Sequence, residues 1–280
     1  MSEDAVPIEV VRSFRSLGTR HFGLDIPKEW EPLVSARIAK QLQCLDMPLE
    51  KYLYRLYNDK EGDEIMAFWE LVRPRPAGFF ARWRDYARLR ARVLHAVARG
   101  QRRFRFWSAG CGSGEEAYGM VLTARHAAAA AGLDPDSIEL KILATDISPR
   151  AIEAGKRGIF EPCQVARVPG RMRGPHFHES CGGVAVSPAI RSPVVFRRLN
   201  LAQAPLPMTG IFDAIFCHEG LAAMVPEARM RATRAAQRLL SRRGLFRAGF
   251  AQELSCASDG AEIGATQPAV AVIPRSPGDC

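Results

Sequence analysis

The chain has 280 residues, of which 47% are hydrophobic and 25% charged, and its formal net charge is +9. This composition is typical of a soluble protein, and the length predicts one full α/β domain with a smaller companion. Its apolar runs are shorter than the roughly 18 residues that cross a membrane, and the acidic start Met1-Ser-Glu-Asp4 is unlike a signal peptide. We therefore expect a cytoplasmic protein with no membrane insertion. The seven cysteines form no C-x-x-C pair, so we expect reduced thiols and no metal site.

Residues 5–72 form a series of amphipathic patterns. Val34, Ile38 and Leu42 recur at helical spacing, and similar patterns follow. The prolines at 74 and 76 interrupt any continuous helix and indicate a linker. The sequence therefore predicts an all-helical N-terminal domain over residues 1–75 and a second domain over residues 76–280.

An arginine-rich helix is predicted from the Phe79-Phe80 pair to about Ala98. Nine arginines lie between residues 82 and 105, against a single acid, Asp85. This segment has three interpretations: a solvated helix face, a docking face for an acidic protein, or an electrostatic footprint for nucleic acid. The sequence leaves these open, and we expect no specific nucleic-acid partner.

A glycine-rich turn follows the apolar strand predicted over residues 103–108. Gly110, Gly112 and Gly114 occupy alternate positions, and a helix is predicted from Glu115 to about residue 131. Glycines allow positive φ and close approach of a ligand, and the helix start offers free N–H groups. The spacing is G-x-G-x-G and not the G-x-G-x-x-G of dinucleotide sites. The pair Glu115 and Glu116 suits an ammonium and a sulfonium, which favours S-adenosylmethionine over NAD. The alternative is a turn that only tightens a strand-to-helix connection.

A second strand is predicted over residues 138–144, and Asp146 follows it. Ligands of open α/β sheets bind at the carboxyl ends of the strands, so Asp146 is placed to accept hydrogen bonds from two ribose hydroxyls. The alternative is a helix N-cap, because Ser148-Pro149 also has the pattern of a helix start.

The rest of the chain completes an α/β fold. A short helix is predicted over residues 151–157. The Gly-, Pro- and Arg-rich stretch 159–196, in which only 183–187 and 194–196 have the pattern of strands, predicts an insertion and not another βαβ unit. Phe212–Cys217 is apolar throughout, as a central parallel strand is. A helix is predicted over 229–240, a turn at Arg243-Gly244, and strands over 245–249 and 270–273. The predicted fold class is α/β.

With these elements placed, the chain resembles the CheR family of chemotaxis receptor methyltransferases over nearly its whole length. The resemblance includes the N-terminal helices and, beyond them, residues 79–80, 107–118, 144–148, 158–160, 195–201 and 212–217. It implies a Rossmann-like, S-adenosylmethionine-dependent methyltransferase domain with an inserted β-subdomain and an all-helical N-terminal domain. By matching positions, Gly110, Glu115, Asp146 and Asn200 would line the cofactor site, with Gly112 and Gly114 in the same loop.

The chain departs from the family pattern at the positions beside the methyl donor. The family has Phe-Phe-Arg where Ala81 follows the Phe pair here, with Arg82 one place later. The family's Arg and Tyr after the Phe212–Cys217 strand are replaced by His218 and Ala223. A later Gly-His-Ser-Glu is replaced by residues 249–252. Arg82 and His218 are therefore the candidate catalytic residues, as partial substitutes.

Two functions follow from the resemblance. The first is S-adenosylmethionine-dependent methylation of glutamate side chains on the cytoplasmic domain of membrane chemoreceptors or related signalling proteins, with full, reduced or lost activity and S-adenosylhomocysteine as the product. The second is a non-catalytic protein of a chemotaxis-like pathway that binds either compound as a regulatory signal.

Overall fold

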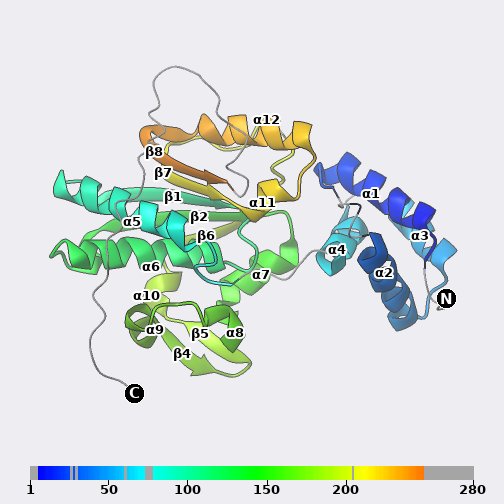
Figure 1. Cartoon of the computed structure of the whole chain (residues 1–280), viewed down its shortest axis with the longest axis horizontal. Helices are drawn as coiled ribbons and strands as arrows, with labels where there is room; N and C mark the ends of the chain where they lie inside the picture. The colour runs from blue at the N-terminus through cyan, green and yellow to red at the C-terminus, as the bar shows by residue number, and fades with distance from the viewer. Residues whose placement is uncertain are drawn as a thin grey trace.

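The computed structural model describes residues 6–25, 28, 31–59, 62–72, 78–203 and 205–248. A group of helices from the N-terminal part of the chain lies beside a larger α/β domain, and a small antiparallel sheet projects from the latter (Figure 1). The strand predicted over 270–273 lies outside the described residues. Among the described helices, none is long and apolar enough to cross a membrane.

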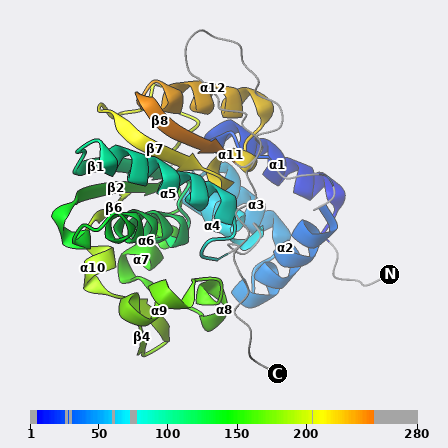
Figure 2. The ribbon, with the colours of Figure 1, turned by 60° about the vertical axis from the view of Figure 1, so that its left-hand side comes forward.

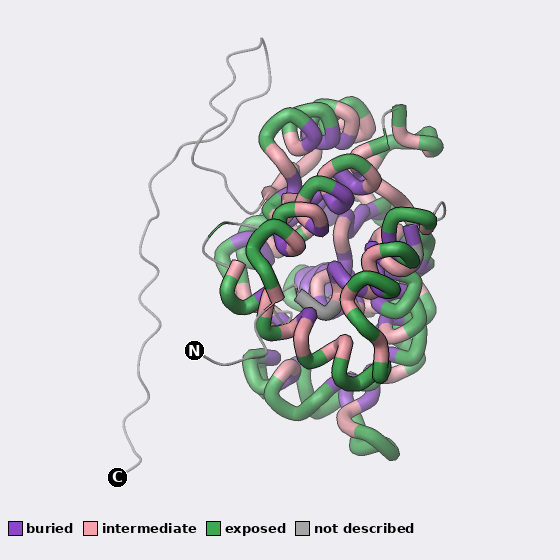
Figure 3. Tube along the Cα trace, turned by 90° about the vertical axis from the view of Figure 1, so that its right-hand side faces the viewer, coloured by how far each residue is buried: buried purple, intermediate pink, exposed green. Residues whose placement is uncertain are grey.

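The N-terminal helices pack through one apolar face each. Phe14 and Phe68 stack with ring centroids 4.0 Å apart, and Val34 and Ile38 are fully buried beside them. Figure 3 shows buried and exposed positions alternating along these helices, which is the pattern of helices with one face on a core. The predicted helices are confirmed, with these bounds: α1 Ile8–Phe22, α2 Glu31–Leu45, α3 Leu49–Tyr57 and α4 Asp63–Val72.

A five-stranded parallel sheet forms the centre of the large domain. The spatial order is β6-β2-β1-β7-β8, and the strands are β1 Arg103–Ala109, β2 Glu139–Asp146, β6 Val194–Arg198, β7 Phe212–Cys217 and β8 Leu240–Ala248. The chain runs from β1 outward to β6 and then returns to the other side of β1. This reversal creates a crevice at the carboxyl ends of β1 and β7, where ligands of such sheets bind. The predicted Rossmann-like α/β class is confirmed.

The two faces of the sheet have separate cores. Phe106 and Phe216 belong to a core shared with α5 (Trp83–Ala98) and α6 (Glu115–Ala130), whereas Trp107 and Ile215 belong to one shared with α12 (Pro226–Gln237) and the N-terminal helices. Figures 1 and 2 show where these helices lie around the sheet. The alternation arises because successive side chains of a strand point to opposite faces. The covering elements are α5 Trp83–Ala98, α6 Glu115–Ala130, α7 Pro149–Arg157, α11 Glu219–Ala222 and α12 Pro226–Gln237.

The N-terminal helices are joined to the sheet by backbone hydrogen bonds as well as by this core. Asp25 N donates to Ala223 O at 2.8 Å, and Val225 N donates to Gly23 O at 2.8 Å. Gly23 ends α1 with φ 64°, and a Cβ there would lie 2.8 Å from the Ala228 Cβ. The end of α1 is therefore pressed closely against the α11–α12 connection.

The insertion forms a three-stranded antiparallel sheet in the order β3-β5-β4. Its elements are β3 Ile159–Phe160, α8 Pro162–Val165, α9 Gly170–His176, β4 Phe177–Ser180, β5 Gly183–Val186 and α10 Pro188–Arg191. Val194–Phe196 fall within the predicted insertion 159–196, but these residues begin β6, which pairs with β2 in the main sheet, so the predicted end of the insertion is wrong. Strands β3 and β4 were not predicted, because each is too short to show a recognisable alternation of apolar and polar residues.

The carboxyl-terminal elements also differ from expectation. Helix α12 ends at Gln237, and Leu240 already pairs with β7. The predicted turn at Arg243-Gly244 lies inside β8 as a bulge. Phe212 pairs with Leu240 and Ala214 pairs with Leu245, so the chain of β8 contains more residues than that of β7 between these two pairs. The glycine thus marks a break in register and not a chain reversal.

Gly155 in α7 provides a test of the packing between α7 and the sheet. A Cβ at Gly155 would lie 2.4 Å from Phe196 Cε1, and its carbonyl accepts a hydrogen bond from the Tyr118 hydroxyl at 2.7 Å. Gly155→Ala should therefore lower the free energy of unfolding by about 1–3 kcal/mol in urea titrations, although alanine is the better helix former. Gly170→Ala at the start of α9, where a Cβ meets nothing within 4 Å, is the matched control and should be neutral or stabilising. Equal stability of the two variants would contradict the packing described here.

Candidate functional site

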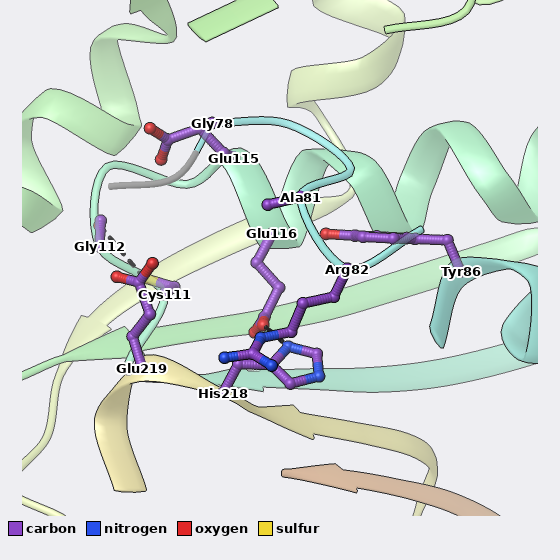
Figure 4. A pocket seen from close by; sticks show the side chains of 11 residues that line it. Gly78, Ala81, Arg82, Tyr86, Cys111, Gly112, Glu115, Glu116, His218 and Glu219 are labelled. Atoms are coloured by element: carbon purple, nitrogen blue, oxygen red, sulfur yellow. Dashed lines mark hydrogen bonds and ion pairs between the residues drawn. The ribbon is translucent and has the colours of Figure 1, made fainter. Parts of the chain in front are cut away.

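A pocket opens at the carboxyl ends of β1 and β7 (Figure 4). It is lined by the glycine loop, the start of α6, the segment before α5 and the first residues after β7, namely Gly78, Ala81, Arg82, Tyr86, Gly110, Cys111, Gly112, Glu115, Glu116, His218 and Glu219. Five predicted site residues are brought together here: Arg82, Gly110, Gly112, Glu115 and His218. Gly114, Asp146 and Asn200 are not among the lining residues, although the first two belong to the loop and its support.

The glycine loop is held to the end of β2 by its own backbone. Gly110, Gly112 and Gly114 have φ values of 76°, 55° and 99°, a region that glycine alone adopts readily. The Gly110 and Cys111 N–H groups both donate to Thr145 O, at 2.7 and 2.9 Å. A Cβ at Gly110 would lie 2.4 Å from the Gly220 Cα, so two backbones touch where α11 begins.

The Asp146 side chain holds the same loop by hydrogen bonds. Its side chain is only 5% exposed; Oδ2 accepts from Gly112 N and Oδ1 from Ser148 N, both at 2.9 Å. Ser148 is the N-cap of α7, since its Oγ accepts from Ala151 N, so the N-cap alternative for Asp146 is wrong. Each carboxylate oxygen has a second acceptor direction, which leaves capacity for hydroxyl donors. Ribose binding by Asp146 stays a prediction.

Glu115 connects the loop to the inserted subdomain. Its carboxylate is buried and accepts from Gln164 Nε2 at 2.7 Å and from Ser113 Oγ at 2.9 Å. Gln164 O in turn accepts from Phe79 N at 3.0 Å. Residues far apart in the sequence thereby fix one wall of the pocket.

Asn200 lies at the boundary with the N-terminal helices. Its Oδ1 accepts from Ala202 N at 2.9 Å and its Nδ2 donates to His21 O at 3.3 Å. Gly114 packs on Tyr118 and Phe196, with which a Cβ would collide. Both residues shape the surroundings of the pocket, and their contact with a cofactor stays a prediction.

His218 lies at the centre of a buried ionic network. Its Nδ1 is 2.5 Å from Glu116 Oε2 and its Nε2 is 2.9 Å from Asp85 Oδ2, and Figure 4 shows Glu116 and His218 pointing toward each other. Arg247 Nε donates to Asp85 Oδ1 at 2.5 Å. Ser108 Oγ donates to Glu116 Oε1 at 2.6 Å. The network joins α5, α6, β1, β8 and the end of β7.

The charges of this network follow from its geometry. Burial lowers the pKa of His218, but the hydrogen bonds to Asp85 and Glu116 outweigh it and raise the pKa to about 9. Burial likewise opposes ionisation of Asp85, yet His218 and Arg247 hold its pKa below the usual value. His218 is therefore an imidazolium near neutral pH with both N–H groups donated to carboxylates. Neither ring nitrogen is left for a substrate, whereas the exposed Arg82 lines the pocket mouth.

Sequence reasoning missed several residues that build the pocket. Asp85 was noted only as the single acid among nine arginines. An isolated acid in a basic segment is the sequence signal that could have identified it as the buried partner of another charged residue. Tyr86 is buried against Gly119, where a Cβ would lie 2.8 Å from its ring, and burial beside Glu116 raises the pKa of its hydroxyl well above normal. Arg247 has no distinguishing sequence context.

The comparison with protein families agrees with this geometry. The family described as "CheR methyltransferase, SAM binding domain" matches residues 76–268. The chain belongs to this family. Its large domain binds S-adenosyl-L-methionine, and the resemblance drawn from the sequence is confirmed.

Relatives and solved structures give further comparisons. A chemotaxis protein methyltransferase 2 of Pseudomonas aeruginosa is 27% identical, with 84% of this chain and 83% of the relative covered. An uncharacterized 104.1 kDa protein of Rhodobacter capsulatus is 32% identical over 72% of this chain, which spans only 21% of that longer protein. The structure of PKMT2 from Rickettsia typhi in complex with AdoHcy is 16% identical at a TM-score of 0.35, covering 62% of this chain and 26% of that one.

The residues of the pocket fit this cofactor. Glu115 and Glu219 supply negative charge toward a ligand that carries an ammonium and a sulfonium. The positive φ at Gly110 and Gly112 turns the loop so that its backbone lines the pocket. Asp146 supports the same loop through Gly112 N.

The ionic network predicts how stability depends on pH. The His218 pKa of about 9 exceeds its ordinary 6.5, so the folded state binds the proton more tightly. Its contribution is complete below pH 6.5, declines as pH rises and is lost above pH 9, a change on the order of 3 kcal/mol. Urea titrations across this range should show the decline in the parent chain and a flatter profile in His218→Gln. His178→Gln, at an exposed strand position, should keep the parent profile; an unchanged profile in His218→Gln would contradict the network.

The cofactor assignment predicts specific losses of affinity. Calorimetry should detect binding of S-adenosylmethionine and S-adenosylhomocysteine but not of NAD. Gly112→Val and Asp146→Ala should each weaken binding by about ten-fold or more, because the first opposes the positive φ and the second leaves two buried N–H groups without an acceptor. Gly182→Val is the control, since Gly182 has φ +90° in the β4–β5 turn with nothing within 4 Å of its Cβ position. Unchanged affinity in both site variants would remove these residues from the cofactor site.

Proposed function

We propose that this protein transfers the methyl group of S-adenosylmethionine to glutamate side chains in the cytoplasmic domain of chemoreceptors or related signalling proteins, and that it acts in the cytoplasm. Membership of the family and the relatives named chemotaxis protein methyltransferase support the reaction and the substrate class. The observation that carries the proposal is the pocket itself, which places the glycine loop and an exposed arginine, Arg82, around one opening.

Methyl transfer to a carboxylate requires little proton transfer by residues of the chain. The cofactor supplies a methyl group on a positively charged sulfur, and a glutamate carboxylate is already ionised near neutral pH, so no general base is needed. The chain must hold the carboxylate in line and exclude water. Arg82 is the group at the pocket mouth with the charge to do so, and Glu219, exposed at the same opening, repels an anionic substrate.

The second candidate is a regulatory protein that binds the cofactor without transferring its methyl group. Two observations favour it. His218 donates both ring N–H groups to Asp85 and Glu116, so it does not replace the family arginine as a substrate contact. Ala81 brings only a methyl group to the pocket, and Ala223 packs against the core of the N-terminal helices.

A radiolabelled transfer assay on cytoplasmic receptor fragments tests both candidates. We expect slow transfer by the parent chain, with the label released by mild base as expected for a carboxyl ester. The Ala81→Arg, Glu219→Asn double variant should accelerate transfer by about ten-fold or more, because it adds a cation and removes a repelling charge beside the carboxylate. The matched control, Ala98→Arg with Glu153→Asn, makes the same changes at exposed positions on α5 and α7 and should leave the rate unchanged.

Each outcome separates the candidates. Base-labile label from the parent chain supports the methyltransferase. Absence of transfer by the parent and the double variant, with cofactor binding intact by calorimetry, would establish the regulatory candidate. Equal acceleration by the control would show that net surface charge, and not the pocket, governs the rate.

A further inference from the structure

A second hollow lies on the other side of the sheet from α5 and α6. It is a groove of about 460 Å³ between α12 and the loop that leads from β6 to β7. Aliphatic side chains, among them Leu206, Met208 and Leu239, form its floor, and three arginines border it: Arg231, Arg234 and Arg238. It shares no lining residue with the cofactor pocket.

The three arginines are placed on one face of the chain by helical spacing. Arg231 and Arg234 lie on α12 and Arg238 directly follows it, at steps of three and four residues. All three are exposed, and within the described part of the chain none of their side chains forms an ion pair or a hydrogen bond. Unlike them, Arg229 on the same helix has a structural task, since it donates to the carbonyls of Leu221 and Met224 at 3.1 and 2.7 Å.

The charged residues that line the groove are all arginines. Residues 226–243 contain six arginines and a single acid, Glu227. Positive potential of this kind attracts an anionic partner, and the aliphatic floor offers burial to an apolar side chain of the same partner. The lining residues include no aromatic ring on which a nucleic-acid base would stack, which favours a protein over RNA or DNA.

We propose that this groove is a docking site for an acidic segment of a partner protein, anchored by an aliphatic side chain on the floor and by carboxylates on the three arginines. The site is independent of the cofactor pocket, so occupancy by such a segment places a second protein on the enzyme without covering the glycine loop. The proposal concerns recognition alone and does not depend on whether methyl transfer occurs.

The test uses the full chain and a labelled amphipathic peptide of about sixteen residues, rich in Glu and Asp with two leucines four positions apart. Fluorescence anisotropy should show binding that weakens as salt is raised. Arg231→Glu, Arg234→Glu, Arg238→Glu together should reduce the affinity by about ten-fold or more. The control reverses three exposed arginines on α1 and α9, Arg12, Arg20 and Arg173, and should bind like the parent. Both variants should keep the parent affinity for S-adenosylmethionine.

The remaining outcomes decide between occupants. A peptide with serine in place of both leucines should lose affinity if the floor takes part. Absence of peptide binding, equal loss in the two variants, or tighter binding of a single-stranded RNA of equal charge would overturn the proposal. Self-association of the parent chain that disappears in the groove variant would also overturn it, in favour of a second copy as the occupant.

Discussion

The ionic network around His218 is the interaction on which the site depends. The His218 imidazolium bridges Asp85 from α5 and Glu116 from α6. Arg247 from β8 donates a further hydrogen bond to Asp85, and Ser108 from β1 donates one to Glu116. A buried carboxylate without such a partner is costly, and breaking a buried pair by removing one member destabilises strongly. The network therefore fixes the start of α6 relative to the sheet. Glu116, whose carboxylate contacts His218, also lines the cofactor pocket. This one side chain therefore belongs both to the buried network and to the pocket wall.

A second set of contacts fixes the glycine loop through its backbone N–H groups. Thr145 O holds two successive N–H groups of the loop, and Asp146 holds a third together with that of Ser148. Trp107 Nε1 donates to Thr145 Oγ1 at 2.9 Å, so the buried side of the sheet is tied to the same residue. The end of β2 thus positions the loop at the end of β1, as the parallel pairing of these strands requires.

Charge is distributed unequally over the molecule. The chain as a whole is basic, with a net charge of +9, but acidic side chains concentrate at the cofactor pocket. The arginines that the sequence groups between residues 82 and 105 do not form one surface. Arg82 lines the pocket, Arg88 lies 3.3 Å from Asp85, and Arg103 pairs with Glu139 on β2. Within the described residues, three arginines whose side chains form no ion pair border an apolar floor elsewhere, along α12.

Local sequence determined the fold class and the loop. The apolar runs of β1 and β7, the alternating glycines and the Asp at the end of β2 are contiguous patterns with direct physical meaning, and the structure forms the strands and the glycine turn where they were predicted. Only the tertiary structure decided the role of His218, because its partners Asp85 and Glu116 lie 133 and 102 residues away along the chain. It likewise assigned Val194 to the main sheet, since a strand of five residues has no local mark of its neighbour. Hydrophobic periodicity and turn chemistry act between near neighbours, whereas a buried charge is defined by residues that meet only after folding.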